Sequence, residues 1–183
     1  MRRLEIGPGP QPLGPEWEAL QHPAATGKPA CADGRCRCGV WGDGRLPFAD
    51  ETFGLVYAAH VLEHVPWNRT QAALAEAHRI LTHGGTFEVW VPNFAYLVAC
   101  YLNRECGDDW RHDNPGDDPM TWLNGRLFTY GPEPNYHKAA FDEASLAAHL
   151  KIAGFRDIAR IDKTEHERGH RHGPISLGFR AFK

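Results

Sequence analysis

The segment from Phe53 to Val91 constrains the fold more than any other part of this 183-residue chain. Phe53–Ala59 predicts a buried strand, and Thr70–Leu81 places apolar residues at helical spacing. The glycines of His83-Gly84-Gly85 end this helix, and Thr86–Val91 predicts a second strand because it is β-branched and aromatic. A strand, a helix and a strand in this order favour an α/β fold with a mostly parallel sheet.

The rest of the chain adds shorter elements around this unit. Four prolines within residues 11–38 exclude a long helix there, and residues 92–140 are expected to be a long irregular insertion or lid. A helix is expected to open at Phe141-Asp142-Glu143 and to run to Ala153. Further strands are predicted at Leu4–Ile6, Trp17–Leu20, Gly39–Trp41, Ile158–Ile161 and Ile175–Phe182.

Composition limits the class of protein. With 20 Lys and Arg against 23 Asp and Glu, the net charge of −3 lacks the basic footprint of a nucleic-acid binder. No apolar run is long enough for a membrane span or a signal peptide, and five cysteines do not suggest a disulfide framework. We expect one domain over residues 1–183, in a reducing, cytoplasmic compartment, with homo-oligomerisation left open.

A glycine-rich turn follows the first predicted strand. Gly7 and Gly9 would let a ligand approach the backbone closely, because glycine has no Cβ. The dinucleotide fingerprint is not met, since Pro10, Pro12 and Pro15 stand where its phosphate-binding helix would begin. A nucleoside ligand without phosphates fits this turn, and a tight turn that binds nothing remains the alternative.

Several motifs resemble class I S-adenosylmethionine-dependent methyltransferases, of the small methyltransferase type 11-like kind found in bacteria and phages. The order and spacing of the motifs carry the resemblance across nearly the whole chain. The similar segments are Leu4–Gly9, Leu46–Tyr57, His60–His64, His78–Thr86, Tyr136–Phe141 and Ala153–Phe155. The resemblance implies a Rossmann-like fold: a seven-stranded, mostly parallel sheet with an antiparallel last strand and helices on both faces.

The same resemblance implies roles for individual residues in binding S-adenosylmethionine. Glu5 would hold the methionine amino group through water, Gly7, Pro8 and Gly9 would lie against the methionine moiety, and His60 would lie near it. Asp43 would accept a hydrogen bond from the adenine amino group, with Gly44 and Arg45 beside it. An ordinary Asp-Gly turn is the alternative for Asp43.

Two departures from the family pattern favour a second interpretation. Gln21 stands where the family usually has an acidic residue that binds both ribose hydroxyls, and an amide makes weaker contacts than a carboxylate. The chain also begins directly at the first strand, without the helix that often covers the cofactor. The alternative to an enzyme is therefore a degenerate methyltransferase-fold module that binds or interacts without catalysis.

Metal sites compete with this interpretation at two places. His60, Glu63 and His64 form a His-x-x-Glu-His pattern, as in inverted zinc peptidases, but Pro66 leaves no room for the helix that would place both histidines on one face. A zinc hydrolase is thus the third hypothesis. Cys31, Cys36 and Cys38 could bind zinc with His22, although free thiols fit their spacing better. We expect no metal at either place.

Acceptor choice is expected to depend on the insertion of residues 92–140, because loops on a rigid scaffold carry specificity. Its aromatic and acidic residues suit a small-molecule or glycan-like acceptor, and Asn93, Phe94, Tyr130 and Tyr136 are the candidate substrate residues. A lid whose aromatic residues simply pack on the domain explains the same composition. His64 and His137 are the candidate bases, with Asp142 as a weaker one.

Overall fold

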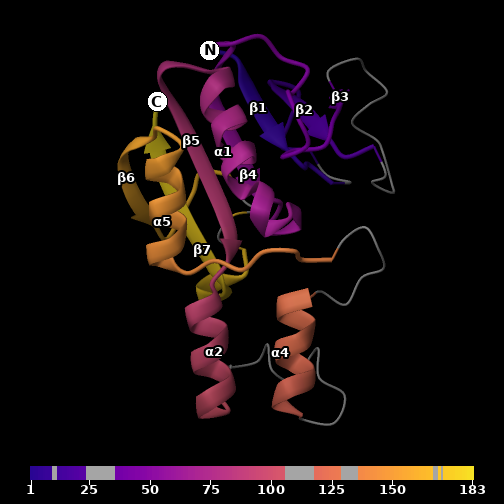
Figure 1. Cartoon of the computed structure of the whole chain (residues 1–183), viewed down its shortest axis with the longest axis vertical. Helices are drawn as coiled ribbons and strands as arrows, with labels where there is room; N and C mark the ends of the chain where they lie inside the picture. Colours follow the sequence, from indigo (N-terminus) through magenta and orange to yellow (C-terminus); the bar gives the residue numbers. More distant parts are fainter. Residues whose placement is uncertain (10–11, 24–35, 106–117, 129–135, 167–168, 170) are drawn as a thin grey trace.

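The computed structural model describes residues 1–9, 12–23, 36–105, 118–128, 136–166, 169 and 171–183. Within these residues seven strands form one sheet in the order β3-β2-β1-β4-β5-β7-β6 (Figure 1). The strands are β1 (Arg3–Ile6), β2 (Trp17–Gln21), β3 (Cys36–Cys38), β4 (Phe53–Ala59), β5 (Leu81–Pro92), β6 (Arg156–Ile161) and β7 (Ser176–Phe182).

The first five strands of the sheet are parallel, and the last strand of the chain runs against them. β4 is central and pairs in parallel with β1 and β5, while β2 and β3 extend the parallel edge. β7 pairs antiparallel with both β5 and β6. This topology confirms the predicted Rossmann-like sheet with an antiparallel last strand.

Helices α1 (Thr70–Ile80) and α5 (Glu143–Ile152) cover one face of the sheet (Figure 1). α1 buries Ala73, Leu74, Ala77 and Ile80, whose spacing forms one helical stripe. These residues belong to the main hydrophobic core, together with alternate side chains of β4 and β5 such as Val56 and Val89. The apolar residues that predicted the central β-α-β unit are therefore the same residues that pack its core.

The opposite face of the sheet carries an aromatic cluster. Trp17, Tyr57 and Trp90 project from β2, β4 and β5 and are buried together. The ring of His166 packs edge-on against Trp17 and Tyr57, with centroids 4.9 and 5.1 Å apart. No helix of the described ranges contributes to this cluster. Helices were predicted on both faces of the sheet, but within the described residues they cover only one face.

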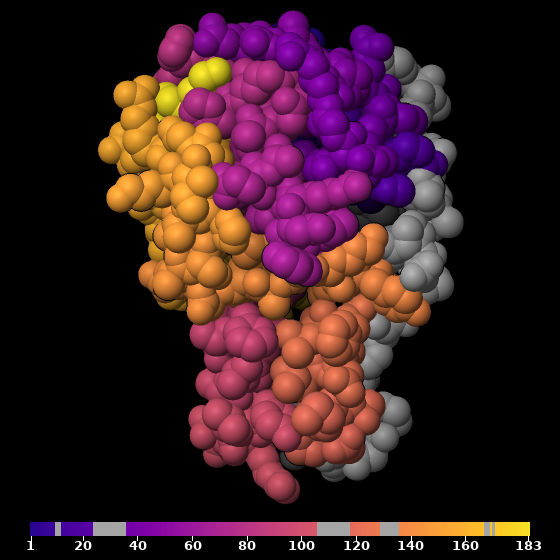
Figure 2. Space-filling view, viewed as in Figure 1, coloured from indigo at the N-terminus to yellow at the C-terminus, as the bar shows by residue number. Residues whose placement is uncertain are grey.

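The insertion differs most from expectation, because its described residues are helical. α2 (Phe94–Asn103) and α4 (Pro119–Phe128) pack on each other and extend beyond the end of β5 (Figures 1 and 2). Their shared core consists of Leu97, Cys100, Trp122, Leu123 and Ile175. The expectation of a wholly irregular stretch over residues 92–140 was therefore wrong. None of the helices within the described ranges is long and apolar enough to cross a membrane.

One predicted strand lies elsewhere. The third strand of the chain, at one edge of the sheet, is β3 (Cys36–Cys38). The segment Gly39–Trp41, which was predicted to be a strand, follows it as irregular chain. Pairing with β2 over Ala19–Gln21 defines this strand, although Cys-Arg-Cys has no strong strand preference of its own. Cys31, the third member of the proposed cysteine group, lies outside the described residues.

Candidate functional site

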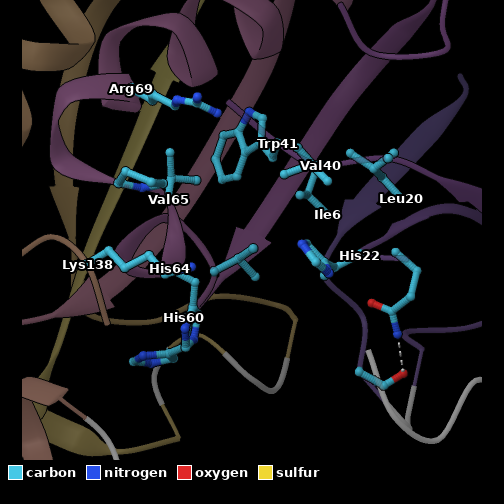
Figure 3. Close-up of a pocket in the computed structure, with 16 residues that line it drawn as sticks. Ile6, Leu20, His22, Val40, Trp41, His60, His64, Val65, Arg69 and Lys138 are labelled. Carbon is cyan, nitrogen blue, oxygen red and sulfur yellow. Dashed lines mark hydrogen bonds between the residues drawn. The ribbon is translucent and has the colours of Figure 1, made fainter. Parts of the chain in front are cut away.

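A cavity of about 380 Å³ opens at the carboxyl ends of β1, β2 and β4 (Figure 3). In parallel α/β sheets this edge is where ligands bind, because the connecting loops diverge there. The lining comes from the ends of strands and from the loops that follow them: Ile6, Gly7, Gly9, Leu20, Gln21, His22, Gly39, Val40, Trp41, His60, Val61, His64, Val65, Pro66, Arg69 and Lys138.

The turn after β1 forms one wall of the cavity. Gly7 and Gly9 have φ of 68° and 61°, a left-handed conformation that glycine adopts without steric cost. The amide of Gly7 donates to the carbonyl of Leu20 at 2.8 Å, which joins this turn to the end of β2. A Cβ on Gly9 would meet no atom of the described residues within 4 Å, so among these residues the backbone there is open to a ligand.

Gln21 ends β2 and lines the same wall. Its side chain is buried, and Nε2 lies 3.5 Å from the carbonyl oxygen of Gly9, to which it donates a weak hydrogen bond (Figure 3). The amide is thus held beside the glycine turn. Gln21 therefore lines the cavity, and its role toward the ribose stays a prediction.

The expected adenine-binding residues lie next to the cavity without lining it. Asp43 is exposed and accepts a hydrogen bond from Arg69 at 2.7 Å, and Arg69 itself lines the cavity. Gly44 has open space where a Cβ would project, and Arg45 pairs with Asp50 at the surface. The structure therefore connects Asp43 to the cavity through a guanidinium group.

Glu5 and Pro8 are also outside the lining. The Glu5 carboxylate is buried, and its Oε2 accepts a hydrogen bond from the amide of Leu13 at 2.9 Å. This contact ties Leu13, in the loop between β1 and β2, to β1. Pro8 is buried within the glycine turn.

His60, the first residue after β4, has a left-handed backbone with φ of 53°, which is uncommon for a residue with a side chain. Its amide donates to the carbonyl of Trp90 at 2.8 Å. On the ring, Nε2 lies 3.0 Å from Ser176 Oγ and Nδ1 lies 3.4 Å from Glu63 Oε1. These contacts fix the imidazole at the carboxyl end of β4, where it lines the cavity.

The two candidate bases lie side by side. The ring centroids of His64 and His137 are 4.9 Å apart, and the carboxylate of Glu63 lies beside both rings. Burial lowers the pKa of His137, which favours its neutral form. Burial alone would raise the pKa of Glu63, but the imidazoles of His60, His64 and His137 outweigh it and lower that pKa. The structure thus joins residues that are 73 positions apart in the sequence.

The His60 and His64 arrangement of a zinc hydrolase is not formed. Leu62–His64 make a single 3-10 turn, η1, which does not place the two histidines on one helical face. Asp142, the weaker candidate base, is the N-cap of α5: its carboxylate accepts a hydrogen bond from the Ser145 amide. That side chain is therefore committed to the helix.

Two of the candidate substrate residues, Asn93 and Phe94, stand where α2 meets the sheet. Asn93 is the N-cap of α2, with its side-chain oxygen 3.3 Å from the Tyr96 amide. Phe94 and Tyr136 are exposed at this end of the sheet. Tyr130 lies outside the described residues. By contrast, Trp122 is fully buried between α2 and α4, so part of the aromatic content of the insertion is core.

Sequence reasoning missed four polar or aromatic lining residues: His22, Trp41, Arg69 and Lys138. Trp41 is buried, and its Nε1 donates to the carbonyl of Ala73 at 2.7 Å, which anchors the cavity wall to α1. Its position two residues before Asp43, in the segment expected to bind adenine, was the one available signal. Arg69 carries no motif of its own. Lys138 lies within the similar segment Tyr136–Phe141, and His22 was considered only as a zinc ligand, so neither was assigned to this cavity.

Comparison with known proteins finds similar domains and similar folds for this chain. Residues 25–89 match the family model of a methyltransferase domain. No curated protein matches the chain closely enough to count as a relative. Solved structures with the same fold share little sequence with it, so they inform the fold alone.

Three of these structures are S-adenosylmethionine-dependent methyltransferases. One, from Thermotoga maritima and described as a possible histamine N-methyltransferase, is 20% identical, with a TM-score of 0.62 over 100% of this chain and 82% of that one. A second, from Mesorhizobium loti, is 14% identical, with a TM-score of 0.58 over 100% and 90%. A third, from Archaeoglobus fulgidus, is 16% identical, with a TM-score of 0.58 over 99% and 85%. They confirm the Rossmann-like fold that the resemblance implied, and the matched domain over residues 25–89 agrees with the methyltransferase motifs.

Proposed function

We propose that this chain, a class I S-adenosylmethionine-dependent methyltransferase by its fold and its matched domain, transfers the methyl group of that cofactor to a small polar acceptor. The observation that carries the proposal is the cavity beside the glycine turn, where Gly9 leaves open space that any side chain would fill. Its volume of about 380 Å³ lies within the usual range for small-molecule sites.

The lining suits the cofactor in composition. Apolar walls from Ile6, Leu20 and Trp41 would take the adenosine part, and Gln21 would bond its ribose. Among the residues that the structure describes, the lining contains no Asp or Glu, but it includes the cations Arg69 and Lys138. An ammonium such as that of Lys138 favours a carboxylate in a site partly shielded from water, as the methionine moiety would supply.

Bound S-adenosylmethionine supplies a methyl group on a positively charged sulfur, which leaves as a neutral thioether when the acceptor attacks. The protein's part is then to position the acceptor and to remove its proton. Positioning alone contributes up to roughly 7–11 kcal/mol in ideal cases. His64 lines the cavity and has His137 beside it, so we assign proton removal to this pair.

The acceptor would enter where α2 meets the sheet. Phe94 exposes aromatic surface there, and Asn93 stands between β5 and α2; Tyr136 is exposed beside His64. Flat apolar rings together with polar side chains suit a ring-bearing, hydroxylated molecule, such as a sugar or a nucleoside-like compound. We therefore propose a small-molecule or glycan-like acceptor.

Isothermal titration with S-adenosylmethionine, using wild type, Gly9→Ala and Gly84→Ala, tests the proposal. Gly9 and Gly84 both have positive φ, and a Cβ would meet nothing within 4 Å at either. Only Gly9 lines the cavity, so the two substitutions carry similar backbone strain but differ at the ligand. We expect micromolar binding by wild type and Gly84→Ala, and at least about tenfold weaker binding by Gly9→Ala, from a loss of about 1.4 kcal/mol or more.

A protein that binds would then be screened for transfer of labelled methyl to hydroxylated and amine-bearing small molecules. No saturation with millimolar S-adenosylmethionine would contradict the proposal and would favour the non-catalytic module. Equal weakening by Gly9→Ala and Gly84→Ala would also contradict it, because backbone strain rather than ligand contact would then explain the loss.

A further inference from the structure

Beside the cavity, two imidazoles and a carboxylate converge. One ring nitrogen each of His64 and His137 and one carboxylate oxygen of Glu63 all lie within 4.8 Å of one another. Glu63 and His64 come from the turn after β4, and His137 comes from the segment that leads to α5. We propose that these three side chains form a binding site for a divalent transition-metal ion of the zinc type.

The carboxylate of Glu63 is the first argument. It is 1% exposed, and neither of its oxygens makes a hydrogen bond; the nearest group is His60 Nδ1, 3.4 Å from Oε1. A buried carboxylate without such bonds is costly unless a positive charge compensates it. A metal ion held between Glu63 and the two histidines would supply that charge at the side of the carboxylate that faces them.

The orientation of the two histidines is the second argument. Nδ1 of His137 lies 3.1 Å from the carbonyl oxygen of Arg126, and Nδ1 of His64 lies 3.3 Å from that of Tyr136. A carbonyl oxygen only accepts, so Nδ1 carries the proton in both rings and Nε2 keeps a lone pair. Metal-binding histidines usually show this arrangement, with the other ring nitrogen donating to a carbonyl or a carboxylate.

The donor set indicates the kind of metal. Two imidazoles and one carboxylate are a known set for catalytic zinc, which keeps a fourth position for water or substrate. Ligands about 2.0–2.1 Å from a tetrahedral ion stand about 3.3 Å apart, so the three groups need to approach by up to about 1.5 Å. Mg²⁺ prefers oxygen ligands and is expected to bind poorly.

His60 would position the site without binding the ion. Its Nε2 lies 3.0 Å from Ser176 Oγ and its Nδ1 lies 3.4 Å from Glu63 Oε1, so its ring is held beside the carboxylate. His64 also lines the cavity, which places the metal beside the proposed cofactor. One consequence rests on the proposed function: an acceptor oxygen in the fourth position would lose its proton more easily, because a bound cation lowers the pKa of its ligand. With the ion bound, His64 and His137 would contribute to proton removal as its ligands; without it, they would act as the bases assigned above.

Cobalt titration of untagged, chelator-treated protein, followed by visible absorption and without S-adenosylmethionine, tests the site by itself. We expect one equivalent to bind, Zn²⁺ to displace it, and Mg²⁺ to have no effect. His64→Ala, His137→Ala and Glu63→Gln should each weaken binding by more than about 10-fold to 100-fold, the range seen when only a supporting residue is lost. His83→Ala is the matched control, because His83 is 81% exposed and pairs with Glu51 away from the cavity.

Thermal melts of all variants keep the test decisive. Glu63→Gln retains the shape of the side chain, and His64 is only half-buried, so these two variants are expected to fold. Absence of saturable cobalt binding would overturn the proposal. Binding that persists in folded Glu63→Gln and His64→Ala would also overturn it, since the metal would then sit on other histidines. Because no cofactor is present, a negative result would leave the proposed methyl transfer to be judged by its own titration.

Discussion

Gly7 lies so close to Val61 that a Cβ on Gly7 would come within 2.4 Å of Val61 Cγ2. The turn after β1 and the segment after β4 therefore meet through a glycine that has no room for a side chain. Because φ of Gly7 is also positive, two independent physical reasons select glycine here. The cavity wall depends on this contact, since both residues line it.

Gly7→Ala is expected to destabilise the protein by about 2–5 kcal/mol, combining left-handed backbone strain with overpacking. Thermal unfolding measures the loss. In a Val61→Ala background the overpacking is relieved, so Gly7→Ala should cost less there than in wild type. Additive effects of the two substitutions would show that Val61 is not the group that excludes a side chain at Gly7.

Gln21→Glu tests how the family's acidic residue would behave in this site. A carboxylate cannot donate to the carbonyl of Gly9 and would be buried, so the free protein should melt at a lower temperature than wild type. Saturating S-adenosylmethionine should raise the melting temperature of the variant more than that of wild type, because a carboxylate bonds ribose hydroxyls more strongly. An equal or smaller rise in the variant would place the ribose elsewhere.

Asp43→Ala is expected to weaken S-adenosylmethionine binding by about 10-fold or more, as loss of one hydrogen bond to a charged group predicts. Isothermal titration checks this, with Asp162→Ala as an exposed acidic control away from the cavity. Arg69→Ala separates two explanations, since Asp43 pairs with Arg69. If Asp43 acts only by holding Arg69, the double variant will be no weaker than either single variant.

Asp142 makes stability depend on acid pH. The Ser145 amide, 2.7 Å from its Oδ1, holds the pKa of Asp142 below its usual value of about 4. The folded pKa is thus lower than the unfolded pKa, so the ionised cap stabilises the protein above about pH 4, and this contribution is lost as the pH falls through the folded value. Asp142→Ala should cost about 1 kcal/mol at pH 7.

Asp142→Asn is the control for charge, because asparagine also caps helices well. Urea unfolding at pH 7 and pH 3 should show wild type more stable than Asp142→Asn at neutral pH, with the gap closing in acid. A gap of constant size across this range would contradict the role of the carboxylate charge.

Arg79 ties the loop before β4 to α1. Its guanidinium donates to both carboxylate oxygens of Glu76, to Asp50 and to the carbonyl of Phe48. Arg79→Ala should lower the unfolding free energy by about 2–3 kcal/mol, and Arg79→Lys should recover only part of it, because lysine cannot form the fork. Arg45→Ala, at an exposed pair with Asp50, should leave thermal unfolding unchanged. Equal losses at Arg45 and Arg79 would refute this distinction.

The central elements could be predicted from the sequence because their local and tertiary signals agree. β4 is both apolar and buried, and α1 buries the stripe that its spacing indicates. α2 gave no such signal: Phe94–Asn103 is apolar on nearly every side and contains aromatic and branched residues, so its helical spacing was hidden. Packing against α4 and the N-cap at Asn93 decide its conformation.

The sequence predicted which strand ends and turns line the cavity, but it did not predict which side chains pair with one another there. Gly7, Gly9, Gln21 and His60 lie at the ends of strands and line one cavity, and their binding of the cofactor stays a prediction. The association of Glu63 with His137 could not be read from spacing, because the fold alone brings residues 74 positions apart together. That Asp43 pairs with Arg69 was hidden for the same reason.

The amides of Lys138 and Ala139 donate to the carbonyl of Glu63 at 2.6 and 3.1 Å. These hydrogen bonds hold Lys138 at the cavity. One side of the cavity is therefore lined by a segment that is synthesised long after the glycine turn. A nascent chain that has emerged only as far as β5 would hold the strands of the pocket without its closing side. Ligand binding should therefore stabilise only the finished protein, and the sheet must begin to fold without help from its cofactor.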